Sequence, residues 1–227
     1  MRFLAIFLFA SILISCSRPK AELKTGTWRG VLVMQEHELP FNFKVVEDSA
    51  GGYDAYLKNA GEELLLDEIM FVNDSINIVL HVFDAQLRAA VNDNSLEGFF
   101  TLNYNPAYKV PFKASFGEDY RFQPTDTTAT ATDFSGKYEV VFVNETDTTQ
   151  SVAIINQKGN YATGSFLTTT GDYRYLEGGV FNDTLFMSTF DGNHAYLFKA
   201  VKNDSMLTGD YWAGQTYHQS WTGFKNE

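Results

Sequence analysis

The side chains best suited to act together on a ligand are those of Asp172, Arg174, Asp191 and His194. Because side chains alternate along a strand, His194 shares a face with Tyr196, and Arg174 shares a face with Asp172. A buried arginine needs an acidic partner, and either aspartate could supply it. The functional interpretation of these four residues is a polar anchor for a ligand, inside or at the mouth of a β-barrel. The structural interpretation is a buried polar network that fixes strand register, or a turn-stabilising Asp-Gly at Asp191-Gly192.

Aromatic residues lie close to these four positions in the sequence. They are Tyr173, Tyr175, Tyr196, Trp212 and Trp221. One interpretation is that they form a platform for a ligand, and Trp212 then completes the candidate ligand-binding set. The other is that they fill a hydrophobic core, which is the commoner place for large aromatic side chains.

The sequence has no motif for nucleophilic catalysis and no cluster of residues for metal binding. Covalent catalysis needs a nucleophile beside a positioned base, and no Gly-x-Ser-x-Gly motif occurs. The histidines that a metal site would use are far apart in the sequence. They are His37, His81, His194 and His218. We therefore predict that the protein is not an enzyme and has no catalytic residue, metal ligand or cofactor.

The N-terminus has the pattern of an export signal. Residues 3–14 form an apolar run shorter than the roughly 20 residues of a membrane-spanning helix. The run ends in Leu13-Ile14-Ser15-Cys16, which resembles the lipobox of bacterial lipoprotein precursors. The resemblance implies cleavage after residue 15 and lipidation of Cys16, with palmitate among the acyl chains. The alternative is an ordinary signal peptide followed by an unmodified cysteine.

Charge and cysteine content narrow the range of partners and compartments. The net charge is −11, and it becomes −12 when Arg2 leaves with residues 1–15. Such a surface repels nucleic acid, so we expect no nucleic-acid partner. Cys16 is the only cysteine, which excludes a disulfide within the chain and a CxxC redox pair. We expect a lipid-anchored protein of the cell envelope. With Ser17 after the cysteine, it would be sorted to the outer membrane and face the periplasm.

Strand-like alternation dominates the rest of the chain. Residues 109–116 alternate cleanly, with Lys109 and Lys113 directed outward, and residues 76–83 place Ile76 and Val82 on the same face. Turn sequences separate these runs, for example Asn73-Asp74-Ser75. No segment has a helical stripe longer than one turn. The sequence therefore predicts an all-β protein.

An internal repeat organises these strands. Matching segments recur at an offset close to 109 residues. Thr25-Gly26-Thr27-Trp28 matches Ser135-Gly136-Lys137-Tyr138, and Leu96-Glu97-Gly98-Phe99 matches Leu207-Thr208-Gly209-Asp210. A low-complexity stretch rich in threonine lies between the two copies. We predict a signal peptide over 1–15, a tether over 16–25, a first unit over 26–122, a linker over 123–134 and a second unit over 135–227.

Each unit has about eight strand candidates joined by short turns, which favours an antiparallel up-and-down barrel. The segment Gly26-Thr27-Trp28 also resembles the Gly-x-Trp opening of lipocalin and avidin-like barrels. The resemblance implies that each unit is a barrel that either fills with side chains or holds one small ligand.

A second resemblance covers roughly residues 26–227. Two segments, 163–178 and 188–198, are similar to the N-terminal accessory region of TlpA-type thioredoxin-like disulfide reductase lipoproteins. In that family the region precedes a thioredoxin domain. The chain ends where that domain would begin and has no CxxC, so the family's redox activity is not carried over. It is either a stand-alone accessory region or a truncated form.

Together these features predict a cell-envelope lipoprotein that acts as a non-catalytic binding or scaffolding module. Its partner would be a small apolar ligand or a periplasmic protein. The alternative is an accessory component of a periplasmic thiol:disulfide oxidoreductase system whose thioredoxin domain lies on another chain. Enlarged cavities would favour a ligand, whereas filled barrels with an exposed apolar patch would favour a protein partner.

Overall fold

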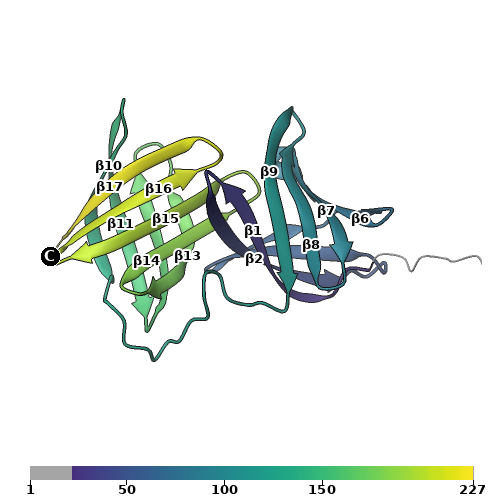
Figure 1. Cartoon of the computed structure of the whole chain (residues 1–227), viewed down its shortest axis with the longest axis horizontal. Helices are drawn as coiled ribbons and strands as arrows, with labels where there is room; N and C mark the ends of the chain where they lie inside the picture. The colour runs from purple at the N-terminus through teal and green to yellow at the C-terminus, as the bar shows by residue number, and fades with distance from the viewer. Residues whose placement is uncertain (1–21, 227) are drawn as a thin grey trace, which may run out of the picture.

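A computed structural model describes residues 22–226, which form two consecutive β units (Figure 1). The predicted signal peptide, Cys16 and most of the predicted tether lie outside these residues. Among the described residues, no helix has the length and apolarity needed to cross a membrane. The all-β prediction of two tandem antiparallel, barrel-like units is confirmed.

The first unit is a sheet of nine strands that follow one another in an up-and-down order, with β1 and β9 paired in the middle. Its elements are β1 (Gly26–Met34), β2 (His37–Glu47), β3 (Tyr53–Asn59), β4 (Glu62–Leu66), β5 (Ile69–Val72), β6 (Ser75–Leu80), the 3₁₀ turn η1 (His81–Phe83), β7 (Ala85–Asn92), β8 (Ser95–Leu102) and β9 (Asn105–Phe116). Val82 lies in η1 and is 86% exposed, so the prediction that it continues the buried face of β6 is wrong.

The second unit is a closed barrel of eight strands, each paired with the next, with β10 pairing β17 to close it. Its strands are β10 (Gly136–Val143), β11 (Thr148–Lys158), β12 (Tyr161–Thr168), β13 (Tyr173–Phe181), β14 (Thr184–Phe190), β15 (Ala195–Asn203), β16 (Met206–Ala213) and β17 (Tyr217–Lys225). This unit has the predicted strand count, whereas the first unit has one strand more.

The extra strand arises because one strand of the repeat is split in the first unit. In the second unit β13 pairs with both β12 and β14 and so completes the barrel. At the corresponding place in the first unit, the chain is interrupted at Asp67-Glu68 into β4, which pairs with β3, and β5, which pairs with β6. The strands β4 and β5 are the two ends of the sheet, so the first barrel is open there.

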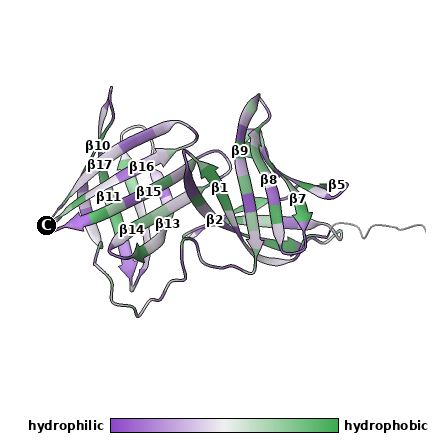
Figure 2. Cartoon of the chain, in the orientation of Figure 1, coloured by the Kyte–Doolittle hydropathy of each residue, from purple (hydrophilic) through white to green (hydrophobic). Residues whose placement is uncertain are grey.

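Alternating burial shapes the interior of both units, as the hydropathy colouring of the strands in Figure 2 illustrates. The repeat also has glycine at one equivalent position in both units, Gly98 in the first and Gly209 in the second. A Cβ on Gly98 would lie 1.9 Å from the carbonyl oxygen of Arg88, and one on Gly209 would lie 2.1 Å from that of Lys199. Both glycines allow the backbone of a neighbouring strand to approach closely, which no other residue would permit.

The open first unit takes part of its core from the second unit. Phe190, Ala195 and Leu197, from the β14–β15 hairpin, are buried in the same hydrophobic cluster as the first unit's core. The ring of Phe190 lies 4.7 Å from that of Phe41 and 5.2 Å from that of Phe100, measured between centroids. The two units therefore share one hydrophobic interface rather than being independent barrels.

A buried arginine at the end of the first unit joins the two units. Arg121 is 4% exposed and its guanidinium donates to groups on both sides of the interface. The Nη2 atom donates to the carbonyl oxygen of Lys58 at 2.5 Å and to Glu177 at 3.1 Å, and Nη1 donates to the Ser188 hydroxyl at 3.4 Å. Its Nε atom has no partner among residues 22–226.

The ends of the predicted linker and tether pack against the units. No strand is formed between Phe116 and Gly136, which leaves the predicted linker, 123–134, between the two sheets. The last residue of this linker, Phe134, is fully buried in the second barrel. Leu23, inside the predicted tether, is 2% exposed in the first core, and Trp28 donates to the Lys24 carbonyl oxygen at 2.9 Å. The folded region therefore begins before Gly26.

Candidate functional site

Four of the five predicted ligand-binding residues line one cavity of about 530 Å³, here called the junction cavity. Asp172 and Arg174 come from the start of β13 and the turn before it, and Asp191 and His194 come from the turn between β14 and β15. The lining is completed by Glu62 of the first unit and by Thr170, Gly171, Tyr173, Tyr175, Thr189 and Tyr196. The cavity therefore lies at the junction of the two units, where Tyr173 and Tyr196 also pack against the core of the second barrel.

Asp191 and His194 are joined by several hydrogen bonds in the wall of this cavity. One carboxylate oxygen of Asp191 accepts hydrogen bonds from the backbone N–H groups of Asn193 and His194, at 3.0 and 2.7 Å. The other oxygen lies 2.8 Å from Nδ1 of His194. This hydrogen bond raises the pKa of His194. Burial raises the pKa of Asp191, but the bonds from His194 and Asn193 outweigh burial and lower it overall.

We expect the ring of His194 to titrate above its ordinary pKa of 6.5, because protonation strengthens its bond to Asp191. Because the pKa of His194 is higher in the folded state than in the unfolded state, the pair increases the free energy of unfolding below pH 6.5. This increase is lost as the pH rises through the folded-state pKa of His194. The effect on stability will be small, because the His194 side chain is 46% exposed. An NMR titration should show the pKa falling in Asp191→Asn and unchanged in Asp204→Asn. A wild-type value at or below 6.5 would contradict the pairing.

Arg174 is not the buried, paired arginine that the sequence predicted. Its side chain is exposed, and no ion pair joins it to Asp172 or Asp191 among residues 22–226. Instead its guanidinium lies 5.6 Å from the centroid of the Tyr175 ring. The buried arginine is Arg121, whose position between two aromatic residues in the sequence was the only signal for it.

His194 precedes β15, which begins at Ala195, and its ring lies 5.5 Å from that of Tyr196, between centroids, as expected for two side chains on the same face. The His194 side chain is 46% exposed, so it is not buried inside the second barrel. Its ring lies edge to face against Phe83 of η1, with centroids 5.7 Å apart. The histidine therefore contacts the first unit across the junction.

Trp212, the fifth predicted residue, lies away from the junction cavity. Its ring is 4.2 Å from that of His37 on β2 and 5.4 Å from that of His218 on β17, between centroids. Nε2 of His218 is in turn 3.0 Å from Asp210. Trp212 also packs against the first unit's core, so it belongs to the interface between the units.

A second cavity of about 460 Å³ occupies the opening in the first barrel, and we call it the seam cavity. It lies between β4 on one side and the end of β6 with η1 on the other. Its lining residues are Glu62, Leu64, Leu65, Leu66, Asp67, Val79, Leu80, His81, Val82, Phe83 and Asp191. Most of this wall is aliphatic or aromatic, and its polar members are Glu62, Asp67, His81 and Asp191. Glu62 and Asp191 line both this cavity and the junction cavity.

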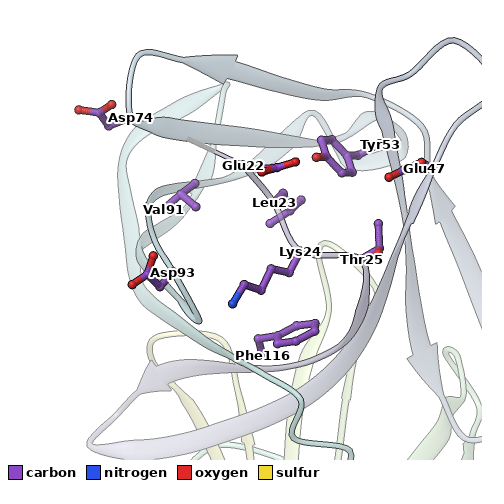
Figure 3. A pocket seen from close by; sticks show the side chains of 10 residues that line it. All are labelled: Glu22, Leu23, Lys24, Thr25, Glu47, Tyr53, Asp74, Val91, Asp93 and Phe116. Atoms are coloured by element: carbon purple, nitrogen blue, oxygen red, sulfur yellow. The ribbon is translucent and has the colours of Figure 1, made fainter. Parts of the chain in front are cut away.

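A third cavity, of about 590 Å³, lies where the chain enters the first unit (Figure 3). Figure 3 shows Lys24 near Phe116 and Tyr53 beside Glu47. Lys24 Nζ is 5.6 Å from the Phe116 ring centroid, and the Tyr53 ring is 5.8 Å from that of Phe71. Charged side chains surround this cavity, so it has no continuous apolar wall.

The seam cavity has only a weak signature in the sequence. Glu62-Glu63 and Asp67-Glu68 enclose Leu64-Leu65-Leu66, which breaks the alternation of a half-buried strand. That pattern marked an irregularity, but nothing indicated that β4 and β5 would pair with different neighbours. Within residues 22–226, no group of three or more histidine, cysteine, aspartate or glutamate side chains is arranged to hold a metal ion.

Comparison with known proteins adds little to this geometry. No family model matches the chain, and no curated protein matches it. One similar solved structure, described as a "putative outer membrane protein" from Bacteroides fragilis, has 11% identity and a TM-score of 0.29, and the match covers 89% of this chain and 97% of that one. Another, a DUF3598-family protein of unknown function from Nostoc punctiforme, has 9% identity and a TM-score of 0.29, with 89% and 96% covered. Such TM-scores carry no argument about function, and the resemblance to TlpA-type accessory regions stays a prediction.

Proposed function

We propose that the protein is a cell-envelope lipoprotein, anchored through lipid on Cys16, whose two units form a non-catalytic binding module. Its ligand is a small apolar molecule held in the seam cavity of the first unit. The observation that carries this proposal is the split strand, which leaves an apolar cavity in the wall of one barrel while the repeated unit beside it is closed.

The second barrel supports the choice of the first unit by contrast. Its interior is occupied by aromatic rings, with Phe166 and Phe198 stacked at a centroid distance of 4.4 Å and Tyr211 4.6 Å from Phe198. Trp221 and Phe142 are also fully buried there. A barrel filled in this way has no room for a ligand, as expected when large side chains meet in an eight-stranded barrel.

The seam cavity has the properties of a small-molecule site. Its volume of about 460 Å³ is within the range usual for such sites. The side chains of Leu66 and Leu80 form its buried floor, whereas Val82 stands at its mouth. Burying the apolar surface of a ligand against these residues would supply the driving force for binding, at roughly 25 cal/mol per Å².

A protein partner is the second candidate, and it has its own supporting observation. The strands β4 and β5 each have one edge that pairs with no described strand. Large apolar side chains beside these edges are exposed, namely Leu65, Met70, Val72 and Val82. An extended segment of another protein could add to such an edge. A thioredoxin-like partner in the envelope is what the family resemblance would suggest for it.

We expect Leu64→Trp to weaken the binding of an uncharged apolar fluorescent probe by tenfold or more, because the indole would occupy the seam cavity. Val82→Asp should weaken it several-fold by placing a charge at the mouth. The full-length protein, held in lipid nanodiscs, would be titrated with the probe, and the urea midpoint of each variant would show that folding is intact.

Val201→Asp is the matched control, since Val201 is 40% exposed on β15 of the second unit. It should bind the probe as the wild type does. If Leu64→Trp and Val82→Asp both fold and bind the probe with wild-type affinity, the seam cavity is not the site.

A further inference from the structure

Two carboxylates stand where the seam cavity meets the junction cavity. Glu62 opens β4 of the first unit, and Asp191 lies in the β14–β15 turn of the second. Since each of them lines both cavities, a ligand lying in the apolar seam would have one end beside these two groups. The residues around this end therefore determine which chemical group it can hold.

Glu62 is the less satisfied of the two carboxylates. Asp191 already accepts hydrogen bonds from its own turn and from His194. The carboxylate of Glu62 takes part in no hydrogen bond or ion pair among residues 22–226, whereas that of its neighbour Glu63 pairs with Lys58 at 3.0 Å. Burial, followed by the charge of Asp191, raises the pKa of Glu62, and Arg174 opposes this shift. A cationic group of a ligand beside Glu62, in addition to Arg174, would reduce the electrostatic repulsion between the carboxylates of Glu62 and Asp191.

The remaining walls of the junction cavity also suit a cation. Tyr173 and Tyr196 line it, with their rings edge to face at 5.0 Å. Aromatic rings combined with carboxylates are the usual surroundings of bound ammonium groups. Asp172 adds a third acid, against which the cavity has Arg174 and His194 as its basic residues.

An anionic end group fits this cavity poorly. Arg174 lies over the Tyr175 ring, and Nδ1 of His194 is engaged by Asp191. An anion would therefore meet the three carboxylates of Glu62, Asp172 and Asp191 against two basic groups, one of which, His194, is already bound to Asp191. A neutral end group would leave the unpaired Glu62 as it is.

We propose that the ligand of the seam cavity is an amphipathic amine, whose apolar part lies in the seam and whose cationic head lies in the junction cavity between Glu62 and Asp191, beside Tyr173 and Tyr196. This inference rests on the proposed function, since it assigns a chemical class to the ligand of the same site.

Three probes that share a phenylpropyl group test the charge preference: phenylpropyltrimethylammonium, phenylpropanol and phenylbutyrate. Binding to the full-length protein in nanodiscs would be measured by calorimetry at neutral pH. The wild type should bind the ammonium probe roughly tenfold more tightly than the alcohol, and the carboxylate most weakly. Glu62→Gln and Asp191→Asn should each reduce the ratio of the affinity for the ammonium probe to the affinity for the alcohol.

Glu63→Gln is the matched control, because Glu63 lies on the same strand but faces outward with its lysine partner. It should keep the full preference. If the alcohol binds as tightly as the ammonium probe, or if Glu62→Gln keeps the preference, the cationic head site is wrong while the seam cavity stands. If the alcohol binds no differently to Leu64→Trp than to the wild type, the proposed function fails, and this inference fails with it.

Discussion

Replacing Arg121 with methionine is expected to lower the free energy of unfolding by about 3 kcal/mol. Arg121 is the charged group that ties the two units together, and its side chain is 3% exposed. Removing it leaves Glu177 at the interface without its cation, and it leaves the carbonyl oxygen of Lys58 without its donor. The cost should lie at the low end for a broken buried pair, because Glu177 is 22% exposed and also accepts from the backbone of Ala60.

Urea unfolding monitored by tryptophan fluorescence would measure this loss. Arg88→Met is the control, since Arg88 is an exposed residue on β7, and its change should stay within about 0.5 kcal/mol. The double variant Arg121→Met/Glu177→Met should recover part of the loss, because no unpaired charge then remains. A single variant as stable as the wild type would show that Arg121 does not couple the units.

Phe190→Ala is expected to cost about 3–5 kcal/mol, the usual range for emptying a fully buried aromatic site. Phe190 belongs to the second barrel by sequence, but its ring packs between Phe41 and Phe100 of the first unit. The loss should therefore fall mainly on the first unit. Its Asn59 also exchanges hydrogen bonds with the Phe190 backbone, at 2.8 and 3.3 Å, and these should loosen with it.

Hydrogen exchange would locate the effect of Phe190→Ala. Amides of β2 and β8 should lose protection, while those of β10 and β17, on the far side of the closed barrel, should keep theirs. Phe224→Ala is the control, because Phe224 is 54% exposed on β17. Equal loss of protection in both units would contradict the view that the hairpin serves chiefly as core for the first unit.

The fold was predictable because its signals are local and repeated. Alternation along residues 109–116 corresponds to β9, and the turn Asn73-Asp74-Ser75 recurs as Asn182-Asp183-Thr184 between the equivalent strands. Gly98 and Gly209, which the repeat aligned, meet the same close backbone approach in both units. Such signals depend on neighbours within one hairpin, so a single sequence contains them.

The site was only partly predictable because it is made by contacts between the units. The sequence grouped Asp172, Arg174, Asp191 and His194 correctly in space, but it did not predict that the first unit contributes to the same cavity. Glu62, which completes the junction cavity, is more than one hundred residues away in the sequence. Trp212 was misplaced for the same reason, since its neighbour His37 comes from the first unit. Docking of two units leaves no periodic signal in either of them.

The most direct test of the binding proposal is native mass spectrometry of the protein purified from its own host in mild detergent. We expect a small molecule to be retained on the wild type and on Val201→Asp, and to be absent from Leu64→Trp, in which the seam cavity is filled. A wild-type protein that carries no small molecule, or a Leu64→Trp protein that retains it fully, would contradict the account.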